Sequence, residues 1–302
     1  MDEKFSADLA RAADELLKGA IELHLHSAPS IFERRADDTL VLAEASAAGM
    51  RALVLKNHEV ETAARVQLLP EGGPGEARAY GSIVLNHPVG GINPAAAEVS
   101  LKLGGRVVWL PTISAKQHIG YFKKQGKSFL GTALKYGSDE GITVFDDSGR
   151  LIPAMADIFD LVNSEEAVLC SGHLSLQETL AAASAFLKPG HRGSFVFTHP
   201  DLSITRSPLE EQLKVAEMGG LIEKCILTTH PAWGGVSIEE FARSIKVIGA
   251  ERCFLSTDAG GTDRPSSPET FKAFIPELLK AGITMKEIRI MVSEVPAMLL
   301  GI

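Results

Sequence analysis

The chain has 302 residues, a length that suits one large α/β domain or two smaller ones. Apolar residues make up 45% of it and charged residues 23%, as in a globular protein with a full hydrophobic core. The formal net charge of −8 argues against nucleic acid or an anionic membrane surface as a partner.

The cysteines and the N-terminal residues predict the cellular compartment in which the protein works. Cys170, Cys225 and Cys253 each lie in an apolar, strand-like run. An odd, scattered set of this kind favours reduced thiols over a disulfide framework. The N-terminus has no apolar stretch of the signal-peptide type, and no run is long enough to span a bilayer. We therefore expect a cytoplasmic protein that acts on a small molecule.

Strands and helices alternate along the whole chain. Helical patterns fall at residues 6–17, 40–48, 59–69 and 94–103, the second of them after an N-cap at residues 37–39. Eight strand-like runs are expected at residues 21–26, 51–58, 79–85, 106–110, 167–170, 194–197, 221–227 and 253–256. A doubly wound sheet alternates in the same way but usually has fewer strands. Eight such units predict a single (β/α)8 TIM barrel over residues 1–302, with its active site at the carboxyl ends of the strands.

One connection is much longer than the others. Residues 113–166 separate the fourth and fifth expected strands. Inside them, residues 142–152 are typical of a hairpin, and a helix is expected from Pro153 to Leu161. Long insertions on the catalytic face are usually functional, so we expect residues 113–166 to form a lid or a contact within a homo-oligomer.

The most informative motif is His24-Leu25-His26, at the end of the first expected strand. Because side chains alternate along a strand, Glu22, His24 and His26 share one face. Two imidazoles about 7 Å apart on one face can bind the same metal ion. Later strands also end in polar residues, namely Lys56 and His58, Asn86 and His87, Thr112, His173, His199, His230 and Asp258.

Structural roles are open for several of these residues. Asp258 can cap the helix that follows it, and His173 and His199 can be buried hydrogen-bonding groups. His58 and His230 can be ordinary loop residues. His118 lies near the expected mouth of the barrel, where it can contact a substrate without binding a metal.

The motifs together resemble the amidohydrolase superfamily of metal-dependent (β/α)8 hydrolases. Four segments carry the resemblance, which spans nearly the whole chain: residues 22–27, 171–178, 197–200 and 256–261. In that superfamily a His-x-His on strand one, histidines on strands five and six, and an aspartate on strand eight build the metal centre. The resemblance thus implies the metal ligands His24, His26, His173, His199 and Asp258.

One part of the superfamily pattern is missing. Two-metal members often carry a bridging carbamylated lysine or a glutamate at the end of strand four, where this chain has residues 107–112 without a lysine or an acid. One or two ions per chain therefore stay open, and Lys56 is either carbamylated or a partner for an anionic substrate. A one-metal centre with His199 as acid–base resembles the deaminase and decarboxylase branches. Histidine and carboxylate ligands suit Zn²⁺, with Mn²⁺ or Fe²⁺ as alternatives.

The resemblance implies a metal-dependent hydrolase of C–N bonds or C–O ester bonds, with metal-bound water as nucleophile and Asp258 as general acid/base. His199 and Lys56 complete the candidate catalytic set. The candidate substrate-binding residues are Arg34, Arg35, Lys56, His58, Asn86 and His230, and arginines there suit a carboxylate. We expect a small polar substrate that bears a carboxylate, such as an amide, a cyclic amide or a lactone. The alternatives are a non-oxidative decarboxylase, a phosphoesterase and a non-catalytic, metal-free barrel.

Overall fold

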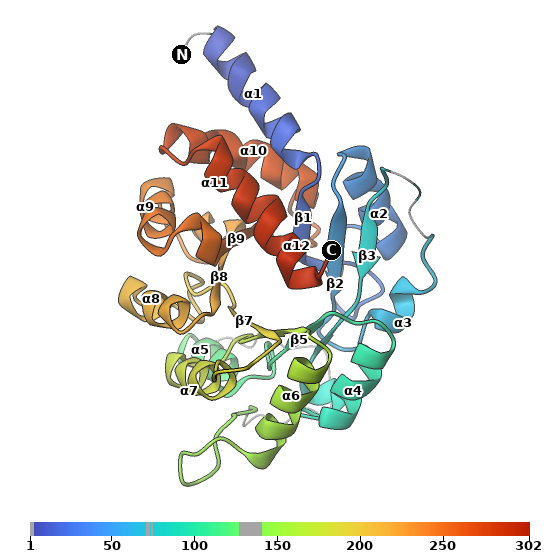
Figure 1. Ribbon diagram of the computed structural model, residues 1–302, viewed down its shortest axis with the longest axis vertical. Helices are drawn as coiled ribbons and strands as arrows, with labels where there is room; N and C mark the ends of the chain where they lie inside the picture. Colours follow the sequence, from blue (N-terminus) through green and yellow to red (C-terminus); the bar gives the residue numbers. More distant parts are fainter. Residues whose placement is uncertain (1–2, 71–72, 74, 127–140) are drawn as a thin grey trace. The chain divides into compact units, whose positions relative to one another are not determined.

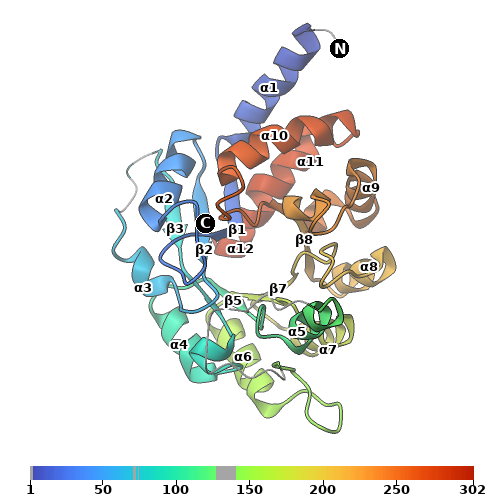
Figure 2. The same ribbon diagram turned by 180° about the vertical axis from the view of Figure 1, so that it is seen from behind.

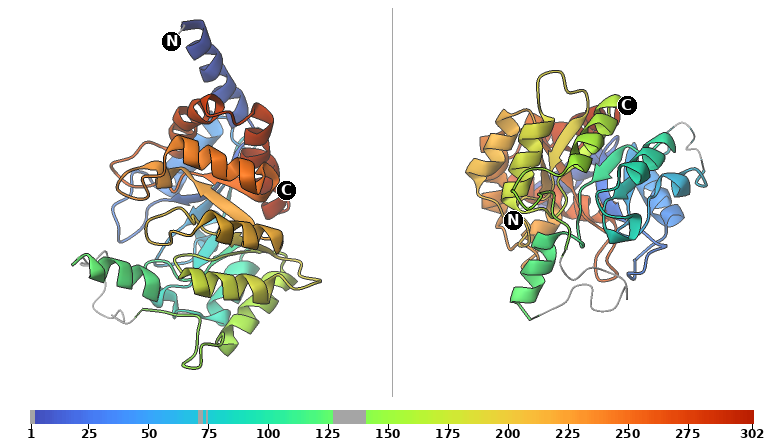
Figure 3. Two further views of the ribbon diagram at one scale, coloured as in Figure 1. Left: turned by 90° about the vertical axis from the view of Figure 1, so that its left-hand side faces the viewer. Right: turned by 90° about the horizontal axis from the view of Figure 1, so that it is seen from below.

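The computed structural model describes residues 3–70, 73, 75–126 and 141–302 (Figure 1). The chain divides into two compact units. Unit 1 comprises Met1–Leu55, Val66–Tyr80 and Glu223–Ile302, and unit 2 comprises Lys56–Arg65 and Gly81–Ile222. Strands and helices alternate along the chain in both, as the views from other sides also show (Figures 2 and 3).

Unit 1 holds the first and the last strands. Strands β1 (Ile21–His26), β2 (Ala52–Lys56) and β3 (Arg78–Tyr80) are neighbours in that order, and Ala52 lies opposite Arg78 in a parallel register. On its other side β1 pairs with the segment that follows β9 (Cys253–Ser256): the His26 amide donates to the Ala259 carbonyl at 2.8 Å, and the Asp258 amide to the His24 carbonyl at 2.9 Å. The last strand thus lies beside the first.

Unit 2 holds the strands between them. Strands β4 (Ser82–Val84), β5 (Val107–Trp109), β6 (Val168–Cys170) and β7 (Ser194–Phe197) are parallel neighbours in sequence order, followed by the start of β8 (Leu221–Cys225). Parallel strands in sequence order, with the last beside the first, are the arrangement of a (β/α)8 barrel. The predicted fold class is confirmed.

Helices follow the strands, as a barrel of βα units requires. In chain order they are α1 (Glu3–Leu17), α2 (Asp38–Ala47), α3 (Ala63–Val66), α4 (Pro94–Lys102), α5 (Lys116–Lys124), α6 (Pro153–Ser164), α7 (Leu176–Phe186), α8 (Leu209–Glu217), α9 (Ile238–Ile248), α10 (Ser267–Lys280), α11 (Met285–Arg289) and α12 (Val295–Leu300). Four of these helices, α7, α9, α10 and α11, begin with a capping box, in which a Ser or Thr side chain accepts a hydrogen bond from the backbone amide of a Glu three residues later.

No helix in the described ranges is long and apolar enough to cross a bilayer.

The expected elements are largely confirmed, with two differences. The third expected strand is broken at Gly81 into β3 and β4, at a point where the backbone passes so close to α3 that a Cβ on residue 81 would lie 2.3 Å from the Ala63 Cα. The helix expected at residues 59–69 shrinks to α3. Its first turn is replaced by a turn in which the Asn57 side chain accepts from the Glu59 and Val60 amides, at 2.8 and 3.1 Å.

The insertion contains the hairpin and the helix that the sequence predicts. The Asp146 amide donates to the Arg150 carbonyl at 2.8 Å, the Ile152 amide donates to the Val144 carbonyl at 3.0 Å, and α6 then begins at Pro153. Helix α5, green in Figure 3, opens the insertion. Residues 127–140 lie outside the described residues, so the role of residues 113–166 as a lid or subunit contact stays a prediction.

Candidate metal centre

The end of β1 carries His24 and His26, and both imidazoles point toward the loop after β9. His24 Nε2 lies 3.2 Å from Asp258 Oδ1, and His26 Nε2 lies 3.3 Å from the same oxygen. One ligand atom from each of the three residues lies within 4.8 Å of the other two. Both histidines are buried and the Asp258 side chain is 16% exposed. The His-x-His motif and the aspartate after the last strand therefore meet in unit 1.

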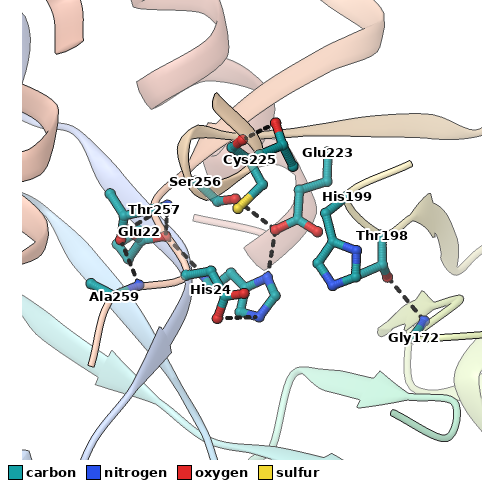
Figure 4. Close-up of polar contacts among 12 residues, drawn as sticks. Glu22, His24, Gly172, Thr198, His199, Glu223, Cys225, Ser256, Thr257 and Ala259 are labelled. Atoms are coloured by element: carbon teal, nitrogen blue, oxygen red, sulfur yellow. Dashed lines mark hydrogen bonds and ion pairs between the residues drawn. The ribbon is translucent and has the colours of Figure 1, made fainter. Parts of the chain in front are cut away.

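A buried carboxylate on β8 sets the orientation of His24. Glu223 Oε1 lies 2.6 Å from His24 Nδ1 and also accepts from Ser256 Oγ at 2.6 Å (Figure 4). A carboxylate can only accept, so Nδ1 of His24 carries a proton, and in the neutral ring the lone pair is then on Nε2. Metal-binding histidines in proteins are commonly fixed by a carboxylate in this way.

The backbone around Asp258 is strained. Asp258 has φ +50°, in the left-handed region that non-glycine residues rarely adopt. Gly260 approaches β1 so closely that a Cβ there would lie 2.2 Å from the His26 carbonyl oxygen. Strain of this kind persists only where the surrounding structure enforces it, and it is common at functional sites.

Charge in the cluster favours an ionised Asp258. Burial opposes ionisation, but His24 and His26 outweigh it and hold the pKa of Asp258 well below its usual range. The centre thus brings together two imidazole nitrogens and one carboxylate oxygen, which with both rings neutral is the donor set that Zn²⁺ and similar divalent ions take. These three residues fit a metal ion.

A second buried carboxylate, Glu22, accepts hydrogen bonds from the segments that carry the candidate ligands. It accepts from the His24 amide at 2.9 Å, the Thr257 amide at 3.1 Å, the Thr257 hydroxyl, and Ser267 Oγ at 2.7 Å. Burial raises the pKa of Glu22 to about 7, although these hydrogen bonds act in the opposite direction. Glu22 thus joins β1, the Asp258 loop and the start of α10, and Figure 4 shows it beside Thr257.

Unit 2 holds a group of three buried histidines. His173 follows β6, and its Nδ1 lies 2.7 Å from Nδ1 of His118, which stands on α5. The rings of His173 and His199 are 5.0 Å apart between centroids. Burial lowers the pKa of His118 to about 3 and that of His173 well below its usual value, and neighbouring histidines add to both effects. Both rings are therefore neutral at pH 7.

His199 has the second strained backbone of the candidate set, with φ +25°. Its Nδ1 lies 3.4 Å from Thr205 Oγ1, whose own hydroxyl donates to the His199 carbonyl at 3.0 Å. Because the only hydroxyl proton of Thr205 is used in that bond, Thr205 Oγ1 accepts from His199 Nδ1–H. His199 then keeps its lone pair on Nε2, as a metal ligand or a base requires.

The polar residues predicted at the ends of the second to fourth strands form a network in unit 2. Asn86 Oδ1 accepts from the Thr112 and Ser114 amides, and Asn86 Nδ2 donates to Thr112 Oγ1 at 2.9 Å. Thr112 Oγ1 also lies 3.0 Å from His58 Nδ1. Lys56 is buried with its Nζ 3.9 Å from the centre of the Trp109 ring. Their substrate-binding roles stay predictions.

The other candidate substrate residues have varied surroundings in unit 1. Arg34 Nη2 lies 3.4 Å from His26 Nδ1, at the edge of the candidate metal centre. Arg35 pairs with Glu44 on α2. His230 is exposed, and its Nδ1 accepts from the Ala232 amide at 3.2 Å. Of these three, Arg34 alone contacts one of the three residues that fit a metal.

Sequence reasoning missed Glu223 and the pairing of His118 with His173. The sequence does contain a feature that points to Glu223: Glu223 and Lys224 interrupt a strand that is otherwise apolar and expected to be buried, where charged residues are rare unless they are paired. His118 had no comparable signal, since its position in the insertion does not say which strand end it reaches.

A family model described as a family of unknown function (DUF6282) matches residues 19–223, more than half of the chain. The chain belongs to this family. The region matched to DUF6282 contains His24, His26, His173 and His199 and ends at Glu223, while Asp258 lies beyond it. No curated protein matches this DUF6282 chain.

Solved structures share the fold of the DUF6282 chain at low identity. A probable dipeptidase, PvdM, from Pseudomonas aeruginosa has a TM-score of 0.63 at 12% identity, covering 98% of each chain. An amidohydrolase from the same organism has a TM-score of 0.60 at 12% identity, covering 95% of this chain and 98% of its own. A 2,6-dihydroxybenzoate decarboxylase from Rhizobium has a TM-score of 0.53 at 13% identity, covering 94% and 99%. The resemblance to the amidohydrolase superfamily is thus confirmed at the level of the fold.

Proposed function

We infer that this chain is a metal-dependent hydrolase of a small polar substrate. One observation carries the inference: Glu223 fixes His24 so that the Nε2 atoms of His24 and His26 both lie within 3.3 Å of Asp258 Oδ1. Two buried imidazoles and a largely buried carboxylate converge there, and polar groups held away from water are costly to the fold unless they are paired. A bound cation removes that cost.

His24, His26 and Asp258 would hold the ion. When bound, a divalent ion lowers the pKa of a water molecule towards neutrality and polarises a substrate carbonyl. Asp258, ionised in its buried position, accepts a proton and passes it to the leaving group. Glu223 keeps the His24 proton on Nδ1. The superfamily pattern assigns His173 and His199 to the same centre, and that assignment is part of the proposal.

The proposed substrate bears a carboxylate in addition to the C–N or C–O bond that breaks. Arg34 is a fully charged, planar donor beside His26, which suits a carboxylate. Lys56 and His58 are buried cationic or polar groups at the end of β2, and Asn86 supplies amide groups. We expect Zn²⁺, with Mn²⁺ or Fe²⁺ as alternatives, and a cytoplasmic homo-oligomer.

A non-oxidative decarboxylase is the second candidate. β5 ends in Trp109 and is followed by Leu110 and Pro111, so no side chain there can bridge two ions. A one-metal centre serves decarboxylation as well as hydrolysis. Release of carbon dioxide from an aromatic or unsaturated carboxylic acid distinguishes the two.

The deciding experiment is elemental analysis of the protein purified without chelator or affinity metal, followed by a substrate panel. We expect about one equivalent of a divalent ion, and turnover of an amide, cyclic amide or lactone. Two equivalents would indicate a bridging group, with Lys56 the first residue to test. No ion and no uptake of Zn²⁺ or Mn²⁺ would contradict the proposal and favour a metal-free barrel.

A further inference from the structure

The contact between His118 and His173 has the geometry of a strong hydrogen bond. The two Nδ1 atoms are 2.7 Å apart, and the ring planes differ by only 9°. The centroids lie 4.9 Å apart, about the sum of the nitrogen–nitrogen distance and the two ring radii. The rings therefore meet edge to edge in one plane, which aligns an N–H of one ring with the lone pair of the other.

Only one proton fits between these nitrogens. Two N–H groups facing each other at this distance would repel, and two lone pairs would leave both atoms unsatisfied. Either His173 donates to His118, or His118 donates to His173. In the first arrangement His173 keeps its lone pair on Nε2, and in the second it carries a proton there. A metal ligand or a base needs the lone pair.

Helix α5 is held firmly enough to impose this contact. The Lys116 amide donates to the Ile142 carbonyl at 2.8 Å, and the Ile142 amide donates to the Ser114 carbonyl at 2.7 Å. Gln117 Nε2 donates to the Ile204 carbonyl at 2.8 Å, in the loop that also holds His199. The start of the insertion thus touches the loops after both β6 and β7.

We propose that His118 is a positioning residue that holds His173 as its Nδ1–H tautomer, with the Nε2 lone pair available for a metal ion or a substrate proton. The direction of the hydrogen bond rests on the proposed function, which requires that lone pair. The insertion then supplies the partner that orients a histidine following β6. The Glu223 carboxylate orients His24 in this way, whereas the imidazole of His118 orients His173.

The test reads the tautomer directly. Long-range ¹H–¹⁵N correlation spectra of ¹⁵N-histidine-labelled, metal-free protein at mildly alkaline pH report which ring nitrogen carries the proton, and a His173→Asn sample identifies the His173 signals. We expect Nδ1–H on His173 in the unsubstituted protein. His118→Phe should move the His173 proton to Nε2, the tautomer that free histidine prefers. His118→Asn, which places an amide near the lost Nδ1, should retain Nδ1–H.

Two outcomes would overturn the proposal. One is Nε2–H on His173 in the unsubstituted protein, and the other is an unchanged His173 spectrum in His118→Phe. The exposed His191 provides a matched control, since His191→Phe should leave the His173 signals in place. With metal and substrate, His118→Phe should lose roughly 10- to 100-fold in metal affinity or activity, and His118→Asn much less. Because the tautomer is read without metal, failure of the metal hypothesis would not be mistaken for failure of this one.

Discussion

His24 Nδ1 and Glu223 Oε1 lie 2.6 Å apart, although 199 residues separate them in the chain and both side chains are fully buried. This hydrogen bond decides which nitrogen of His24 faces Asp258. It therefore aims His24 Nε2 at the same carboxylate oxygen that His26 Nε2 approaches, as the proposed metal centre requires.

Glu223→Gln should weaken metal binding. Glutamine keeps the size of the side chain but can also donate, so it no longer fixes the His24 proton on Nδ1. We expect affinity for Zn²⁺ to fall roughly 10- to 100-fold in a competition titration with a chelating dye. Glu251→Gln, at an exposed position in unit 1, is the control and should bind as the unsubstituted protein does. Equal affinity in both variants would remove Glu223 from the centre.

Asp258→Asn should abolish most of the activity without unfolding the chain. Asparagine tolerates the left-handed backbone that Asp258 adopts at φ +50°, so the substitution removes charge and proton transfer but leaves the loop geometry. We expect kcat to fall by about 10²- to 10⁴-fold. Asp263→Asn changes an 82% exposed carboxylate in the same loop and should have little effect. If kcat is unaffected in Asp258→Asn, Asp258 has only a structural role.

Metal removal should lower thermal stability through His24 and His26. An ion that binds only the folded chain stabilises it by about 2.7 kcal/mol at a free concentration of 100 times Kd. We expect dialysis against a chelator to lower Tm, and added Zn²⁺ to restore it. The double variant His24→Ala with His26→Ala should fold, as circular dichroism reports, but show no rise in Tm with Zn²⁺. A rise like that of the unsubstituted protein would place the ion elsewhere.

The ion pair between Glu287 and Lys246 should make stability fall in acid. Burial works against ionisation of Glu287, but hydrogen bonds from Lys246 and Thr284 prevail and lower its pKa from 4.5 to about 2. A carboxyl with a lowered folded-state pKa stabilises the fold above its unfolded pKa, and that contribution is lost as pH falls from about 4.5 towards 2. Both side chains are partly exposed, so the effect is less than about 1 kcal/mol.

Glu287→Gln tests this contribution, because glutamine can still serve the Thr284 capping box that begins α11. The difference in unfolding free energy between the two proteins should be constant near neutral pH and shrink below about pH 4.5. Glu239→Gln, at an exposed position on α9, should not reproduce that trend. A difference that grows in acid would show that the sign is wrong.

The sequence by itself determined the order of the strands and the residues that end them. Alternation of side chains along a strand is local, so His24 and His26 could be placed on one face before any contact was known. The carboxyl ends of parallel strands share one edge, which linked Asp258 to the His-x-His motif. Capping at Asp37 and the hairpin before Pro153 were likewise readable from neighbouring residues.

Only the tertiary structure decided which polar groups touch. Glu223 joins His24, His118 joins His173, and Arg35 turns to Glu44 on α2. Hydrogen bonds depend on the positions of atoms to within a few tenths of an ångström, and residues far apart in sequence reach them only once strands and loops have packed. Periodicity gives the face on which a side chain lies, but it does not specify a partner or a tautomer.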